Sequence, residues 1–348
     1  MRVAIVTLPL LSNFGGILQN FALQTALKSL GHMPVTIDYD VSPSIFRQGL
    51  RCAKVLIQQG RHFKMPSMYK RNKHVAPFIE KNILMTERTK TYNKPSLRKY
   101  EAYVVGSDQV WRYSYSKPVI KDVYLKFTEG LACKRISYAA SFGSSSLDYP
   151  EKIIKQCKDL IKEFDAVSVR EETGVKICRD IFNQQAELVI DPTLLNDKEV
   201  YYGLCQGVPT QKSILLAYVL DMTPQKLKLI QKTASEKKLE PIIVSEKREG
   251  GITIEEWLAY FRDAEFVFTD SFHGTVFSII FEKDFVTLNN TNRGTDRFLS
   301  LLNRFLLEDR LINNAEIDTL KDINWDKIRE IKTEVANYGL NFLRNSLS

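Results

Sequence analysis

Residues 3–39 read VAIVTLPLLSNFGGILQNFALQTALKSLGHMPVTIDY, and this stretch decides the fold. The apolar run at 3–8 predicts a buried strand. The apolar residues between 18 and 30 then recur at the spacing of a helix, which Gly31 ends. A second strand is expected at 34–39. A strand, a helix and a second strand in so short a stretch form the βαβ unit of a parallel sheet.

The same alternation continues along the chain. Helices are expected near 150–164 and 171–182. The pattern predicts an α/β fold with two Rossmann-like domains that face a cleft. Further strands are expected at 102–106, 135–141, 166–170 and 187–191 in the first half, and at 213–220, 241–245, 265–270 and 285–288 in the second.

This pattern divides the chain into three segments. The first domain is expected over 1–195 and the second over 196–320. The last segment, 321–348, carries one amphipathic helix at 325–347, which is long enough to pack back on the first domain.

Charge is unevenly spread over the 348 residues, whose net charge is +8. Between 47 and 99, fourteen basic residues face only Glu80 and Glu87. This basic block is explained either by a solvated helical face or by attraction to phosphate, a lipid surface or nucleic acid. Nucleic acid is disfavoured, because no zinc-finger, RRM or convincing helix-turn-helix pattern accompanies the charge.

Composition restricts the class of protein further. The five cysteines are an odd count without a CxxC pair, so neither a zinc site nor a disulfide framework is indicated. No apolar run approaches the ~20 residues that a membrane span needs. We therefore expect a cytoplasmic protein without a metal site.

The loops that follow the strands are the candidate ligand sites, because ligands of open α/β sheets bind beyond the carboxyl ends of the strands. In SNFGGILQ (12–19), Gly15 and Gly16 allow close approach of backbone N–H groups to a ligand. In VGSDQVW (105–111), Asp108 can bind sugar hydroxyls or accept a proton from one. Trp111 either stacks on a sugar or fills the core. Ser141 and Arg170 also lie at strand ends, in roles that are either structural or functional.

The most informative stretch is TDSFHGTVFSIIF (269–281). Asp270 or Ser271 is a good N-cap, which puts His273 in the first turn of a helix, beside the small Gly274. The unpaired N–H groups and the dipole of such a turn favour phosphate or carboxylate. On the next polar loop, Arg293 and Arg297 are suited to bind the same anions.

Taken together, SNFGGILQ, GSDQVW, YAASFG, SVRE, DPTLL and TDSFHGTVFSIIF resemble, in this order, the bacterial polysaccharide pyruvyl transferase family over about residues 1–310. The resemblance implies a GT-B-like fold with phosphoenolpyruvate as the donor. The product would be a pyruvate ketal across two hydroxyls of a sugar in a surface-polysaccharide precursor. Some members carry an Arg two residues before their histidine, where this chain has Ser271. The role of phosphate partner then passes to Arg293 or Arg297, with Arg170 a further candidate.

The resemblance also assigns roles. His273 would be the proton donor or phosphate partner, and Asp108 the base on the acceptor side. No cofactor is implied besides phosphoenolpyruvate as co-substrate. The acceptor would be lipid-linked, and the basic block could then contact an anionic membrane. The expected donor-binding residues are Ser271, His273, Gly274, Arg297, Arg293 and Arg170, and the expected acceptor-binding residues are Asn13, Gly15, Gly16, Gln19 and Ser141.

Two alternatives remain open at this point. A GT-B glycosyltransferase that uses a nucleotide sugar would have the same architecture and the same interdomain cleft. A non-catalytic binder of an anionic polymer would explain the basic block but would leave the polar loops without a purpose.

Overall fold

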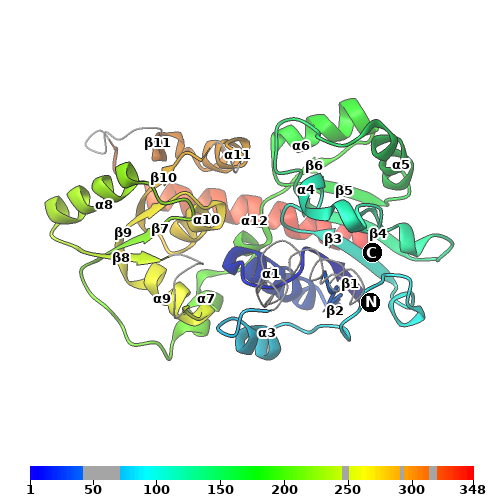
Figure 1. Ribbon diagram of the computed structural model, residues 1–348, viewed down its shortest axis with the longest axis horizontal. Coiled ribbons are helices and arrows are strands. Elements are labelled where there is room, and N and C mark those ends of the chain that lie inside the picture. Colours follow the sequence, from blue (N-terminus) through cyan, green and yellow to red (C-terminus); the bar gives the residue numbers. More distant parts are fainter. Residues whose placement is uncertain (42–70, 245–250, 291–293, 313–319) are drawn as a thin grey trace, which may run out of the picture.

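Two parallel sheets, each flanked by helices, make up the protein (Figure 1). A computed structural model describes residues 1–41, 71–244, 251–290, 294–312 and 320–348. The first sheet lies within residues 2–188 and the second within 214–312. The boundary expected at residues 195 and 196 falls in the connection between the two sheets.

The first sheet has the strand order β2-β1-β3-β4-β5-β6, with every pair parallel. Its order reverses between β1 and β3, and such a switch point is where ligands bind in doubly wound sheets. The strands are β1 (Arg2–Val6), β2 (Met33–Thr36), β3 (Ala102–Gly106), β4 (Lys134–Ala140), β5 (Ala166–Val169) and β6 (Glu187–Leu188). Its helices are α1 (Phe14–Ser29), α3 (Ala76–Asn82), α4 (Tyr113–Ser116), α5 (Glu151–Ile161) and α6 (Glu172–Ile177).

The second sheet repeats this arrangement with the order β11-β10-β9-β7-β8, again all parallel. Its switch point lies between β7 and β9. The strands are β7 (Ile214–Tyr218), β8 (Glu240–Val244), β9 (Ala264–Thr269), β10 (Asp284–Leu288) and β11 (Leu311–Ile312). Its helices are α7 (Lys198–Cys205), α8 (Pro224–Lys237), α9 (Ile254–Asp263), α10 (Phe272–Ile280) and α11 (Asp296–Phe305).

Aromatic side chains join the two domains beside their switch points. Phe14 begins α1 of the first domain, and its ring lies 5.8 Å from that of Trp257 and 6.4 Å from that of Tyr218, both in the second domain. All three side chains are almost fully buried in one continuous core cluster. The interface therefore holds the start of α1 directly against the second domain.

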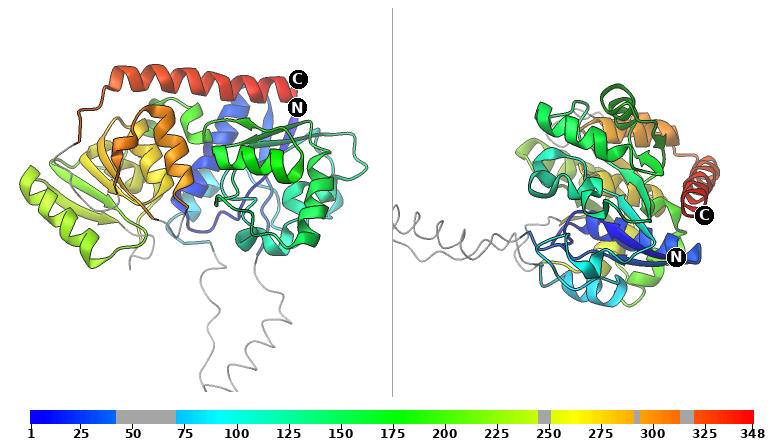
Figure 2. Two further views of the ribbon diagram at one scale, coloured as in Figure 1. Left: turned by 90° about the horizontal axis from the view of Figure 1, so that it is seen from above. Right: turned by 90° about the vertical axis from the view of Figure 1, so that its right-hand side faces the viewer.

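The last helix, α12 (Trp325–Leu347), crosses from the second domain to the first, as the red helix of Figure 2 shows. Its Phe342 ring lies 6.1 Å from the ring of Tyr138 on β4. A Cβ at Gly339 would lie 2.4 Å from the Tyr138 hydroxyl, so the glycine allows α12 to approach this close. The helix expected at 325–347 thus has the predicted bounds and spans both sheets.

Most of the predicted elements are present. All ten predicted strands occur within a few residues of their expected bounds, whereas the two-residue β11 was not predicted. The helix expected at 171–182 is α6 followed by a π-helical turn at Cys178–Phe182. Trp111 is fully buried and donates its indole N–H to the Val123 carbonyl at 3.1 Å, so it fills the core.

The basic block lies partly outside the described residues, which resume at Arg71. Arg71 pairs with Asp38 at 3.2 Å and Arg88 with Asp40 at 3.2 Å, so these two charges are balanced within the first domain. In the described residues, no helix combines the length and apolar character needed to cross a membrane. Nor does that part of the chain bring together three His, Cys, Asp or Glu side chains that could hold a metal ion.

Candidate functional site

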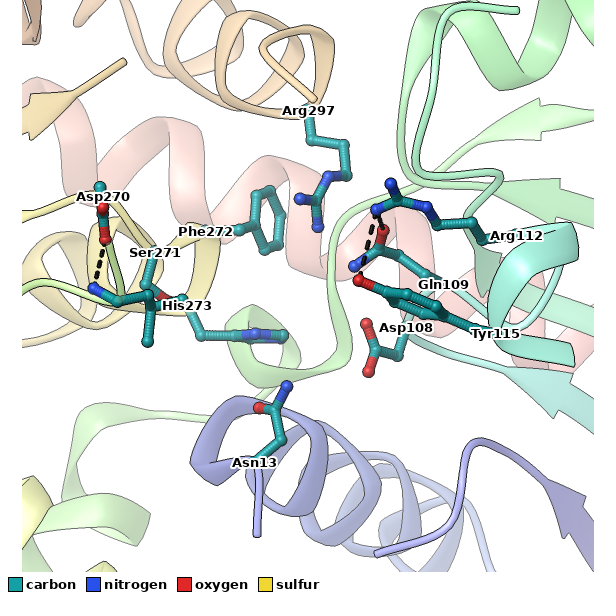
Figure 3. A pocket seen from close by; sticks show the side chains of 11 residues that line it. Asn13, Asp108, Gln109, Arg112, Tyr115, Asp270, Ser271, Phe272, His273 and Arg297 are labelled. Carbon is teal, nitrogen blue, oxygen red and sulfur yellow. Dashed lines mark hydrogen bonds between the residues drawn. The ribbon is translucent and has the colours of Figure 1, made fainter. Parts of the chain in front are cut away.

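A small pocket, with a cavity volume of about 40 Å³, lies between the two switch points. Side chains from both domains point into it (Figure 3). Its lining includes Asn13, Asp108 and Arg112 from the first domain, and Ser271, His273 and Arg297 from the second.

His273 lies in the first turn of α10, as the sequence predicted. Ser271 caps this helix by accepting a hydrogen bond from the N–H of Gly274 at 3.4 Å. The imidazole packs against the start of α1, where a Cβ at Gly15 would lie 2.1 Å from Nδ1. Gly15 is therefore needed for a close contact between the domains.

Glycine is also required at position 274, for the packing of α10. A Cβ there would lie 2.0 Å from the Thr269 hydroxyl, so the glycine lets α10 pack against the end of β9. Gly16 sits on the other side of the pocket, where a Cβ would lie 3.3 Å from Oδ2 of Asp108.

Asp191 connects His273 to the first domain. Its Oδ2 lies 3.6 Å from Nε2 of His273 and accepts a hydrogen bond from Arg170 at 2.7 Å. Its Oδ1 accepts hydrogen bonds from the N–H and hydroxyl of Thr193 at 3.1 and 2.7 Å. Burial by itself would raise the pKa of Asp191, but His273, Arg170 and Thr193 together lower it below its ordinary value. Asp191 is therefore an ionised carboxylate that is buried behind the pocket lining, in contact with Arg170 and close to His273.

Arg170 extends this chain of charges to Asp108. Its other terminal nitrogen donates to Oδ1 of Asp108 at 3.3 Å, and its Nε lies 3.9 Å from Glu171. Burial opposes the charge of the guanidinium, yet Asp191, Asp108 and Glu171 raise the pKa of Arg170 above its ordinary value. Asp108, Arg170, Asp191 and His273 therefore form one line of charged or polar groups from the first domain to the second.

The backbone holds Asp108 in an uncommon conformation, with a φ of 64°. This left-handed turn follows directly on β3, and the Asp108 carbonyl accepts hydrogen bonds from the N–H groups of Val110 and Ser141. The Asp108 side chain is 9% exposed, and its Oδ1 accepts a hydrogen bond from Arg170. The conformation and the ion pair together fix the carboxylate at the pocket wall.

Arg297 is the buried cation of the second domain that lines the pocket. It comes from the first turn of α11 and lies 5.6 Å from the centre of the Phe272 ring, while Arg170 lies 4.5 Å from the same ring. Burial, together with the charge of Arg170, lowers the pKa of Arg297 to about 10. Arg297 remains charged at neutral pH, which makes this side of the pocket attractive to anions.

The predicted residues occupy different places in the structure. Asn13, Asp108, Ser271, His273 and Arg297 line the pocket. Gly15, Gly16 and Arg170 lie directly behind this lining, in contact with His273 and Asp108. Arg293 falls outside the described residues.

Gln19 and Ser141 are fully buried and lie beneath the pocket rather than in it. The Gln19 amide donates to the Thr7 hydroxyl and to the Gly16 carbonyl, and accepts from the N–H of Ser107. The Ser141 hydroxyl accepts from the N–H of Gly143 at 3.0 Å. Both side chains hold the loops in place.

Sequence reasoning missed several side chains of the site. Asp191 is the last residue of the strand predicted at 187–191, so the strand-end rule that singled out Asp108 would also have found it. Gln109, Arg112 and Tyr115 come from the segment after β3, and Phe272 precedes His273. The aromatic residues Tyr115 and Phe272 lie in helices, and the sequence around them carries no signal that separates a core position from a pocket wall.

Residues 13–292, well over half of the chain, match the sequence model of the family described as polysaccharide pyruvyl transferase. The chain belongs to the polysaccharide pyruvyl transferase family. The resemblance seen in the motifs is thereby confirmed, and the protein is a member of a transferase family. Comparison with curated protein sequences gave no match.

A solved structure shares the fold. The UDP-GlcNAc 2-epimerase from Neisseria meningitidis, solved with UDP-GlcNAc bound, aligns with a TM-score of 0.50 at 10% identity, over 99% of this chain and 94% of that one. A glycosyltransferase from Rickettsia africae aligns with a TM-score of 0.46 at 11% identity, over 100% of this chain and 94% of that one. At such identities the likeness concerns the fold alone. The predicted GT-B-like arrangement of two domains is confirmed for this family member.

Proposed function

We propose that the protein transfers the pyruvyl group of phosphoenolpyruvate to two hydroxyls of a sugar in a bacterial surface-polysaccharide precursor. The products are a pyruvate ketal and phosphate. One observation carries the proposal: His273 and Arg297 of the second domain and Asp108 of the first line a single pocket. This set offers a proton donor, a cation and a base, which such a transfer requires.

The second domain is the proposed donor side. The N-terminus of α10, with Ser271 and His273, supplies N–H groups and a favourable dipole for phosphate. Arg297, at the start of α11, adds a buried positive charge beside them. We assign the phosphate of the donor to this group of residues, because N–H donors, a helix dipole and a positive charge all favour a phosphate anion.

The reaction adds a proton to C3 of phosphoenolpyruvate, while a sugar hydroxyl forms a bond to C2. His273 is the proposed source of the C3 proton, and Asp108 the proposed acceptor of the hydroxyl proton. A second hydroxyl then bonds to C2 as the bond between C2 and the phosphate oxygen breaks. Phosphate leaves with the proton of the second hydroxyl. One donor and one diol thus give one ketal and one phosphate.

Asp191 and Arg170 are proposed to act through other residues. The Asp191 carboxylate, 3.6 Å from Nε2 of His273, can balance a positive imidazole during proton donation. Arg170 orients the Asp108 carboxylate by donating to its Oδ1. Both are positioning residues in this scheme.

The first domain is the proposed acceptor side. Asn13 caps α1 by accepting from the N–H of Gly16 at 2.8 Å, and its exposed side chain lines the pocket near Asp108. We propose that the acceptor is lipid-linked and that the basic block brings the protein to an anionic membrane surface, since fourteen basic residues lie between 47 and 99.

The proposal is tested by incubating the protein with phosphoenolpyruvate and a panel of polyprenyl-diphosphate-linked saccharides. The expected product gains the mass of pyruvic acid less one water, with one phosphate released per ketal. Transfer of a sugar from a nucleotide sugar to the same acceptors, without consumption of phosphoenolpyruvate, would contradict it.

A further inference from the structure

Three guanidinium groups lie in or directly behind the pocket: those of Arg112, Arg170 and Arg297. Arg170 is 5% exposed and interacts with Asp108, Asp191 and Glu171. Its charge is balanced inside the protein, and its side chain does not line the pocket. The cations that face a ligand in this pocket are therefore Arg112 and Arg297.

Arg112 is held in place by neutral groups. One terminal nitrogen donates to the Gln109 amide oxygen at 2.9 Å and to the Tyr115 hydroxyl at 3.4 Å. The guanidinium lies over the Tyr115 ring, 4.7 Å from its centre. None of these side-chain partners, among the described residues, carries a negative charge. The contacts therefore orient Arg112 and leave its positive charge available to bind an anion.

The two arginines approach the pocket from different domains. Arg112 comes from the segment after β3 of the first domain and Arg297 from α11 of the second, and Figure 3 shows both guanidinium groups directed toward the pocket. A backbone contact brings their segments together: a Cβ at Gly294 would lie 2.7 Å from the Gly143 carbonyl, and one at Gly143 would lie 3.0 Å from Cδ of Arg112.

The donor under the proposed function carries two anionic groups, a phosphate and a carboxylate, on the same carbon. The phosphate suits the second domain, where His273, Ser271 and the N-terminus of α10 accompany Arg297. The carboxylate is then directed toward the first domain. A planar guanidinium with one nitrogen already anchored matches a carboxylate well, because its remaining N–H groups form a fork.

We infer that Arg112 binds the carboxylate of the donor, so that the donor bridges the two domains. The inference rests on the proposed function and adds a residue that distinguishes phosphoenolpyruvate from a simple phosphate. Arg112 is a binding and specificity residue in this account, and Gln109 and Tyr115 position it.

The test is calorimetric titration of two probes, phosphoenolpyruvate and inorganic phosphate, into the wild type and into Arg112→Gln and Arg297→Gln. We expect Arg112→Gln to weaken phosphoenolpyruvate binding at least about tenfold, the loss typical of a charge-assisted pair, and to change phosphate binding less than twofold. Arg297→Gln is expected to weaken both. Arg112→Lys should restore only part of the lost affinity.

Lys117→Gln is the matched control, because Lys117 is an exposed cation on the same segment outside the pocket lining. It should leave both affinities unchanged. Phosphoenolpyruvate binding within twofold of wild type in Arg112→Gln would overturn the inference, and so would equal weakening of both probes. Failure of the wild type to bind phosphoenolpyruvate would remove the proposed function itself, which makes the two failures distinguishable.

Discussion

At the scale of single residues, the Asp191 side chain connects the two domains. Its carboxylate touches Arg170 of the first domain at 2.7 Å and approaches His273 of the second at 3.6 Å. It is 1% exposed, so its removal leaves buried partners without their counter-charge. The cost of an uncompensated buried charge far exceeds that of an exposed pair.

Asp191→Asn should lower the free energy of unfolding at neutral pH by roughly 3–5 kcal/mol. The pKa of Asp191 is lowered by folding, so its contribution is full above the unfolded-state pKa of ~3.9 and is lost as the pH falls through the folded-state value. The stability gap between wild type and variant should therefore narrow in urea titrations below about pH 4. Asp180→Asn, which removes the exposed partner of Arg179, is the control and should show no such gap. A stability difference between wild type and Asp191→Asn that grows as the pH falls would exclude the stabilising role of the ionised Asp191 carboxylate.

His273→Gln should leave the fold intact and reduce transfer at least about 100-fold, the usual contribution of a general acid. The residue lies at a helix start facing the pocket, so its loss removes chemistry more than packing. Steady-state rates with the thermal midpoint as a folding control check this. Activity within tenfold of wild type, with an unchanged midpoint, would mean that another group donates the proton.

The sequence allowed the positions of His273 and Asp108 to be predicted because N-caps and strand ends follow local rules. It did not separate Asn13 from Gln19, which share one loop and helix start. Asn13 is the N-cap and points outward, whereas Gln19 lies further along α1 and turns toward Thr7 and Ser107. Which face of the helix meets the pocket is set by packing between distant segments.

At the scale of elements, α1 and α10 approach each other through Gly15 and His273. Glycine is required at this point because a side chain would overlap the imidazole. Strands of four to seven residues were predictable from apolar runs. The two-residue β11 consists of two apolar residues between polar neighbours, whereas the equally short β6 belongs to the apolar run 188–190, which is why only β6 was predicted.

Gly15→Ala should lower the transfer rate by roughly 100-fold, because its Cβ would lie 2.1 Å from Nδ1 of His273 and displace either the imidazole or the start of α1. Gly203→Ala is the matched control, since a Cβ at this position of α7 would meet nothing within 4 Å. The control should keep full activity and gain roughly 0.5–1 kcal/mol of stability. Equal activity of the two variants would show that the contact with Gly15 does not position His273.

At the scale of the whole molecule, the facing switch points place the pocket. Each sheet has its order reversal next to the strand that leads into a pocket loop, namely β3 before Asp108 and β9 before Ser271. The alternation of strands and helices predicted two such sheets. Their relative orientation depends on contacts such as Phe14 with Trp257 and α12 with β4, which no local pattern reveals.

The central claim is that this pocket binds phosphoenolpyruvate as the donor. Thermal unfolding of the wild-type protein, followed over a concentration series of phosphoenolpyruvate and a parallel series of UDP, tests it most directly. We expect the unfolding midpoint to rise with the concentration of phosphoenolpyruvate, as it does for a ligand that binds only the folded state, and to stay constant with UDP. A midpoint that rises with UDP and not with phosphoenolpyruvate would contradict the account.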